Sequence, residues 1–129
     1  SYPYHNLGYN LRKDKVLIIN GDTGSDIGAN NRGTIIVNGD TGDNAGYLME
    51  DGEIIINGNA GKRPGFVMYN GKIWIKGDAS EVGDYARGGK IFVDGNFDIG
   101  YECNARIYHI DGEILHQEYK KKFHAFSDE

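Results

Sequence analysis

The sequence predicts an all-β protein: a parallel β-helix, or solenoid, of about six coils with about eighteen residues in each. The first observation is a glycine that recurs at nearly constant spacing, once per coil. The second is a run of β-branched and apolar residues directly before each glycine. The third is that so short a unit cannot bury its own apolar face, so it must stack on copies of itself. The recurring glycines are Gly21, Gly39, Gly58, Gly77, Gly95 and Gly112.

Each expected strand carries apolar side chains at alternate positions. Side chains alternate between the two faces of a strand, so stacking at constant register aligns equivalent residues in columns that fill the interior. The strands expected from the repeat include 34–37, 53–56, 72–75 and 90–93. One inward column is expected to contain Leu17, Ile35, Ile54, Ile73, Ile91 and Tyr108, and a second to contain Ile19, Val37, Ile56, Ile75, Val93 and Ile110.

Two further columns are expected on the other sides of each coil. A third apolar column, expected opposite the strands, contains Met49, Met68, Ala86 and Cys103. Small residues mark a narrow corner, at Thr23, Thr41, Ala60 and Ala79, with Phe97 as the exception in the shortened last coil. Glycine suits such corners because it adopts positive φ and allows close backbone approach.

The chain is predicted to be one β-helix domain over residues 1–129, because its length fits a single hydrophobic core. We expect an N-terminal cap over 1–14, coils over 15–114 and a C-terminal cap over 115–129. Within that last cap, apolar residues at helical spacing predict a capping helix over 115–126. These residues are Leu115, Tyr119, Phe123 and Phe126.

Composition favours a cytoplasmic protein that binds neither nucleic acid nor membrane. The net charge is −5, and no basic stripe is long enough to follow a phosphate backbone. No apolar run approaches the roughly 20 residues of a transmembrane helix. The one cysteine cannot form an internal disulfide, and the first residues do not resemble a signal peptide.

The repeat reads Gly-[Asp/Asn]-[Thr/Ala]-Gly-x-x-x-Gly and then Gly-x-Ile-x-[Val/Ile]-x-Gly, over about residues 16–112. This pattern resembles the GXGXG family of right-handed β-helices, which includes the C-terminal domain of the glutamate synthase large subunit and the β-helical subunit of formylmethanofuran dehydrogenase. The resemblance implies a right-handed, non-catalytic structural module that packs against catalytic subunits of such an oxidoreductase complex. It implies no catalytic residue and no cofactor. The chain is shorter than the typical domain, and Phe97-Asp98 replaces Ala-Gly in its last coil.

Several polar residues are candidate sites, and a structural role is favoured for each. The column Asp22, Asp40, Asn59, Asp78 and Asn96 could bind divalent cations, but turn and inter-coil hydrogen bonding is preferred because two members are Asn. The histidines His5, His109, His116 and His124 lack metal-ligand spacing. We expect Cys103 to be a buried, inert thiol. We expect solvated surface at Lys62-Arg63-Pro64 and at Lys120-Lys121-Lys122, and we predict no metal site.

The alternative to a structural module is a small β-helix enzyme of acyltransferase or hydrolase type, with an unrecognised site. Left-handed acyltransferase helices repeat an aliphatic residue at every sixth position, whereas the glycines here follow one another at unequal steps, as in Gly21, Gly24, Gly28, Gly33 and Gly39. A pectin-lyase-like enzyme requires long loops around a groove, and the uniform coil length leaves none.

The residues between the two inward columns form the predicted functional surface. This column is apolar until His109, although a water-facing strand surface is normally polar, and soluble monomers seldom expose such a patch. We therefore predict an interface with Trp74 as its anchor, which binds a catalytic subunit or, without another partner, a second copy of the chain. The alternative is a cover formed by the chain's own N-terminal segment or C-terminal helix. The predicted interface residues are Ile18, Ile36, Ile55, Trp74 and Phe92.

Overall fold

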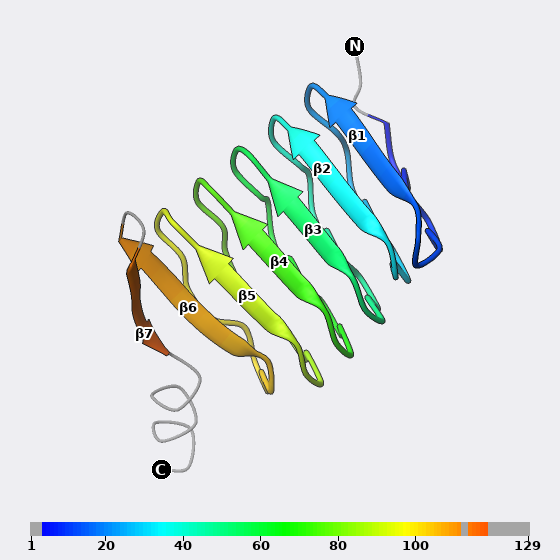
Figure 1. Cartoon of the computed structure of the whole chain (residues 1–129). Helices are drawn as coiled ribbons and strands as arrows, with labels where there is room; N and C mark the ends of the chain where they lie inside the picture. The colour runs from blue at the N-terminus through cyan, green and yellow to red at the C-terminus, as the bar shows by residue number, and fades with distance from the viewer. Residues whose placement is uncertain (1–3, 112–113, 119–129) are drawn as a thin grey trace.

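The structure, a computed structural model, describes residues 4–111 and 114–118. In this part of the chain it is all-β, with six parallel strands and a seventh that pairs antiparallel at one end of the sheet (Figure 1). With the sheet toward the viewer, each strand runs to the upper left and the next coil lies to the lower left, so the solenoid is right-handed (Figure 1). The predicted right-handed parallel β-helix is confirmed. The strands are β1 (Val16–Asn20), β2 (Thr34–Asn38), β3 (Glu53–Ile56), β4 (Lys72–Ile75), β5 (Lys90–Val93), β6 (Arg106–Asp111) and β7 (Ile114–Glu118).

Parallel pairing in register places equivalent residues of successive coils side by side. Ile35 pairs with Ile54, and Ile54 pairs with Ile73. The two predicted inward columns are confirmed from β2 to β5, where Ile35, Val37, Ile54, Ile56, Ile73, Ile75, Ile91 and Val93 are buried. The third column and the corner column are also buried, at Met49, Met68, Ala86, Cys103, Thr23, Thr41, Ala60 and Ala79. The core therefore runs through the middle of the coils as parallel columns of buried side chains.

Gly28 shows why the loop half of each coil requires glycine. Its φ is +72°, and a Cβ atom there would lie 2.7 Å from Cδ1 of Ile54 in the core. A side chain at this position would be strained and would also displace a core residue. Positive φ recurs at alternate loop positions, at Asp26, Gly28 and Asn30 in one coil and at Asn44, Gly46 and Leu48 in the next.

Residues 4–14 repeat the loop half of a coil ahead of β1. The Asn6 N–H donates to the Ser25 carbonyl at 2.9 Å, and the Gly28 N–H donates to the Leu7 carbonyl at 2.8 Å. These bonds attach the segment to the loop of the following coil. The alternation of positive φ is also repeated, at Asn6, Gly8 and Asn10.

The prediction that Tyr108 points into the core is wrong. Ile107 takes that place, because it pairs with Ile91 and is fully buried, whereas Tyr108 pairs with Phe92 on the outer face. The last coil is shorter than the one before it, since fewer residues separate Ile91 from Ile107 than separate Ile73 from Ile91.

The same shift overturns the outward position predicted for His109. His109 pairs with Val93 and so takes the inward position that was expected for Ile110. The cause is the length of β6, which has six residues. Ile107 lies one position further ahead of Gly112 than the equivalent inward residue of each earlier coil lies ahead of its glycine. Counting back from this glycine therefore gives a register that is one residue late.

The predicted capping helix over 115–126 is wrong where the structure describes it. Residues 114–118 form β7, which pairs antiparallel with β6, with a register shift between His109 and Ile110. Without β7 the far edge of β6 would have no partner strand, so β6 offers an edge with which the returning chain can pair. The remaining part of the predicted helix, 119–126, lies outside the described residues.

Replacing Ile54 with aspartate tests the inward column. A carboxylate in this aliphatic interior should cost at least about 3 kcal/mol, a large part of a typical unfolding free energy of about 5 to 15 kcal/mol. We expect thermal denaturation followed by circular dichroism to show an unfolded or strongly destabilised domain. Ile18→Asp is the control, because Ile18 is 56% exposed, and its melting temperature should stay within about 4 °C of the parent. A parent-like melting curve for Ile54→Asp would contradict the assignment.

Candidate functional site

The outer face of the sheet carries the predicted interface residues in one column. Ile18 pairs with Ile36, Ile55 pairs with Trp74, and Trp74 pairs with Phe92. In-register pairing thus brings together residues that lie a whole coil apart in the sequence. The structure adds one residue at the position where His109 was expected. The outer column is defined as Ile18, Ile36, Ile55, Trp74, Phe92 and Tyr108.

The outer column is aliphatic and open at one end, and aromatic and tightly packed at the other. Ile18 is 56% exposed, whereas Phe92 is 7% exposed. The rings of Trp74 and Phe92 stack with centroids 4.0 Å apart, and those of Phe92 and Tyr108 stack at 5.0 Å. Phe92 is therefore covered on both sides by neighbouring rings. The half-buried members are Ile36, Ile55, Trp74 and Tyr108.

A hydrogen bond fixes the indole of Trp74 on this face. Its Nε1–H donates to Oε2 of Glu53 at 2.9 Å. Glu53 pairs with Lys72 in the register of the sheet. Within the described part of the chain, however, the two side chains form no ion pair with each other. The carboxylate is directed to the indole, so it holds Trp74 instead of pairing with Lys72.

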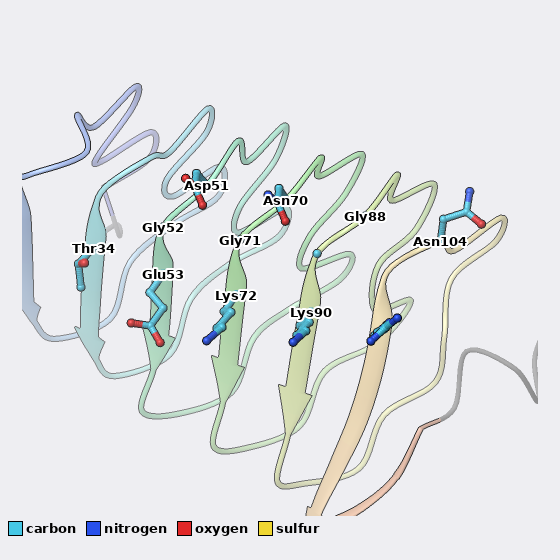
Figure 2. A pocket seen from close by; sticks show the side chains of 12 residues that line it. Thr34, Asp51, Gly52, Glu53, Asn70, Gly71, Lys72, Gly88, Lys90 and Asn104 are labelled. Atoms are coloured by element: carbon cyan, nitrogen blue, oxygen red, sulfur yellow. The ribbon is translucent and has the colours of Figure 1, made fainter.

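A row of cations lies beside the aromatic half of the outer column. Lys72 pairs with Lys90, and Lys90 pairs with Arg106, at the first positions of β4, β5 and β6. Adjacent members are separated by the strand spacing of about 4.8 Å. This set is named the cationic row. Figure 2 shows Lys72 and Lys90 side by side. The row lines a groove of about 610 Å³, together with residues that include Thr34, Glu53, Asn70 and Asn104.

Asp51 and Glu53 line the same groove as the cationic row, but neither forms an ion pair with it within the described part of the chain. The ion pair found there joins Arg63 and Glu81, at 3.4 Å, and none of the three cations takes part in one. Like charges at directly paired strand positions destabilise a sheet. The row therefore has a local cost that an anionic partner would reduce.

Sequence reasoning missed the cationic row because no basic run marks it. Its members lie on successive coils, so they meet only when the coils are aligned. The available signal was the strand position just before the inward column. That position reads Val16, Thr34, Glu53, Lys72, Lys90 and Arg106.

On the opposite side of the outer column lie asparagine side chains that form hydrogen bonds with one another. The Asn38 side-chain amide donates to Oδ1 of Asn20 at 2.8 Å, and that of Asn57 donates to Oδ1 of Asn38 at 2.9 Å. Next to this ladder lies a hollow of about 300 Å³, lined by residues that include Ile55, Trp74, Lys76 and Phe92. The aliphatic half of the outer column is thus bordered by amides on one side, and the aromatic half is bordered by cations on the other side.

A second column at the corner, made of Asp and Asn side chains, stabilises the stacking of the coils. It is formed by Asp22, Asp40, Asn59, Asp78 and Asn96. Oδ1 of Asp22 accepts from the backbone N–H of Asp40 at 2.8 Å, and Oδ1 of Asp40 accepts from that of Asn59 at 2.8 Å. The pattern continues from Asn59 to Asp78 and from Asp78 to Asn96. This is the inter-coil hydrogen bonding that the sequence favoured over cation binding. Within the residues described, no three metal-ligating side chains cluster.

The remaining candidate residues are dispersed. His5 Nδ1 accepts from the Ser25 N–H at 2.8 Å beside the first coil, and the ring of His109 on β6 lies 5.9 Å from that of Phe97. Cys103 is fully buried in the core. The ion pair to Glu81 and a ring contact to Phe66 hold Arg63 in place, while Lys62 is exposed. His116 lies on β7, and 120–122 and His124 lie outside the described residues.

Comparisons with known proteins found no relative: no family model, no curated protein and no solved structure matches this chain. In the described residues, no helix has the length and apolar character needed to cross a membrane. The outer face of the sheet, with its apolar column and its row of cations, is therefore the feature from which a function is inferred.

The hydrogen bond between Trp74 and Glu53 gives a direct probe of this face, because the chain has a single tryptophan. We expect Glu53→Ala to release the indole, to increase quenching of its fluorescence by acrylamide, and to lower the unfolding free energy by about 1 to 2 kcal/mol. Glu53→Gln removes the charge but keeps an oxygen acceptor, so its quenching should remain close to that of the parent. Equal quenching in the parent and the Ala variant would show that the bond does not hold the indole.

Proposed function

We propose that this chain is a non-catalytic structural module that binds a protein partner through the outer face of its sheet. The observation that carries the proposal is the outer column, which is apolar on the side of the sheet that faces away from the core. Ile18, at its open end, is 56% exposed. A few buried residues, often Trp, Tyr or Arg, contribute most of the binding energy at protein interfaces, and Trp74 is therefore the natural anchor.

The cationic row defines the chemistry of the partner. Lys72, Lys90 and Arg106 lie along the same face as the apolar residues and make no ion pair within the described residues. They form a local positive edge on a chain whose net charge is −5. The complementary surface is an apolar strip with carboxylates along one side, because complementary charge sets orientation and speeds association.

The resemblance of the repeat to the GXGXG β-helices supports a catalytic subunit as this partner. It would belong to an oxidoreductase complex like glutamate synthase or formylmethanofuran dehydrogenase. In such a complex the solenoid serves as a rigid scaffold: its strands hold the outer column and the cationic row at fixed spacing, and it contributes no reacting group.

A small β-helix enzyme is the competing function, and no described constellation favours it. The two described histidine side chains lie on different coils: His5 contacts the first and His109 is on β6. General acid–base or nucleophilic catalysis requires such groups within hydrogen-bonding distance of each other or of a shared substrate.

The purified chain should therefore show no glutaminase, synthase, acyltransferase or esterase turnover. The measurement is product formation with each substrate class, at protein concentrations high enough to detect slow reactions. A sustained rate that His109→Ala or Cys103→Ala abolishes would contradict the structural role, since neither side chain lies on the proposed docking face.

Docking is tested by site-specific photo-cross-linking in the organism that expresses the chain. A photoreactive residue at Ile18 should trap a partner, whereas one at Tyr69, which is 49% exposed on the loop half of its coil, should not. With the trapped partner purified, we expect Ile55→Lys combined with Trp74→Lys to weaken binding by about a hundredfold, on the scale of an interface anchor. Lys90→Glu should weaken binding by about tenfold at low salt and by less at high salt.

The control for charge is Lys62→Glu, because Lys62 is exposed at a corner away from the outer column, and its effect should stay below about twofold. Equal trapping at Ile18 and Tyr69 would contradict the proposal, and so would a Lys90→Glu variant that binds as well as the parent. If the trapped protein is the chain itself, and sedimentation shows the double variant as a folded monomer of a dimeric parent, the face serves self-association instead.

A further inference from the structure

The groove beside the cationic row lies where the loop half of each coil enters its strand (Figure 2). We propose that this groove binds the phosphate group of a small phosphorylated molecule. Its volume of about 610 Å³ is within the usual range of small-molecule sites, roughly 300 to 1,000 Å³. Its lining residues lie between positions 34 and 106, on coils whose strands have a neighbour on each side. The inference does not rest on the proposed docking function, because it concerns a ligand of the chain alone.

An extra residue in each of three successive coils shapes the groove. In the coil of β2 a single amide at this place, that of Arg32, bonds to the coil before it. In the coil of β3 the N–H groups of Glu50 and Asp51 both donate to the Asn31 carbonyl, at 3.0 and 3.1 Å. The same doubled bond recurs in the coils of β4 and β5. Bulges are frequent next to functional sites, and here the second residue of each pair lines the groove, at Asp51, Asn70 and Gly88.

The bulge leaves three backbone amides in the lining of the groove without an acceptor. In the coil of β2, which lacks the extra residue, the Gly33 N–H donates to Oδ1 of Asn31 at 3.0 Å. The equivalent glycines of the next three coils line the groove, and among the described residues their N–H groups have no hydrogen-bond acceptor. An amide that the protein leaves unpaired is satisfied by water or by a ligand. These donors lie about one strand spacing apart, at Gly52, Gly71 and Gly89.

Side-chain donors lie on both sides of these glycines. Figure 2 shows Asn70 on one side of Gly71 and Lys72 on the other. Lys90 and Arg106 continue the cationic side at the same register, in β5 and β6. An anion in the groove would therefore meet positively charged groups on one side and an amide side chain on the other, with backbone N–H groups between them.

A phosphate group fits these donors better than a carboxylate does. It carries a charge of about −1.5 to −2 near pH 7 and presents three strong acceptor oxygens. A carboxylate carries one charge and presents two oxygens. Lys72, Lys90 and Arg106 place three positive charges within two strand spacings, about 10 Å. A bound phosphate would accept charge-assisted hydrogen bonds from these cations and would offset their mutual repulsion.

The other end of the groove is acidic, and this asymmetry orients the ligand. Asp51 is exposed there, and Glu53 accepts the hydrogen bond from the Trp74 indole. A long polyanion that filled the whole groove would be repelled by these carboxylates. The ligand is therefore a small molecule that places its phosphate against β4 and β5 and a hydroxyl group toward Asp51.

Titration of the isotopically labelled full chain with inorganic phosphate and with glycerol phosphate, at constant ionic strength, tests the site. Both should give saturable amide shifts at Gly71, Lys72, Gly89 and Lys90. Glycerol phosphate should bind at least about threefold more tightly, because its hydroxyl groups reach Asp51. Asp51→Ala should remove this preference without weakening the binding of inorganic phosphate.

Lys90→Gln tests the cationic side of the groove. It should weaken the binding of both probes by about tenfold or more, on the scale of a hydrogen bond to a charged group. Lys76→Gln is the matched control, because Lys76 is an exposed lysine directly after β4 that lies outside the groove lining. Its effect should stay below about twofold.

Four results would overturn the proposal. The first is the absence of saturable shifts with either probe, and the second is parent-like affinity in the Lys90→Gln variant. The third is slow hydrogen exchange of the Gly71 and Gly89 amides in the ligand-free chain, which would show that they already have an acceptor. The fourth is binding of succinate as tight as that of phosphate, which would leave the docking proposal intact. Equal affinity for the two phosphate probes would overturn the ester and assign the site to free phosphate.

Discussion

Backbone hydrogen bonds between successive coils are the interaction on which the rest of the structure depends. The Gly42 N–H donates to the Gly24 carbonyl, and the Gly61 N–H donates to the Gly42 carbonyl, one coil apart in each case. A coil satisfies few of these groups internally, so no coil is stable alone. The bonds fix the spacing and the register together, and side-chain columns follow because equivalent residues have no other place to lie. The core columns are thus a consequence of backbone pairing, which their burial then stabilises.

The same register stacks polar side chains as strictly as apolar ones. Stacked polar groups need hydrogen-bond partners. At one corner Asp22 and Asp40 find them, because each carboxylate accepts a hydrogen bond from a backbone N–H of the next coil. Asparagines find such partners on the sheet, because an amide both donates and accepts and can pair with its own kind. Lysine and arginine side chains can only donate hydrogen bonds, so the members of a column of cations cannot pair with one another. In the cationic row, unlike the Asp and Asn columns, stacked side chains therefore do not satisfy one another.

The sequence predicted the features that repeat, and it failed where the chain leaves the repeat. The period aligned the strands, the inward columns and the first members of the outer column, because each is set by local alternation and constant coil length. The register of Tyr108 and His109 was wrong because β6 is longer before Gly112 than the earlier strands are before their glycines. β7 was predicted as helix because helical spacing was considered without the competing edge of β6. The cationic row depends on residues far apart in sequence, so local patterns could not show it.

Departures from the repeat also coincide in space, which bears on function. Trp74, Phe92 and Tyr108 replace the aliphatic residues of the outer column in β4, β5 and β6, the strands that also carry the cationic row. None of these positions faces the core, so folding does not require aromatic or cationic residues at them. The core needs only alternate strand positions to be apolar, so the outer positions need not be aromatic or cationic for the core to form. A binding role accounts for both kinds of departure with one surface, whereas a purely structural role would account for the stacked rings and leave the row of like charges unexplained.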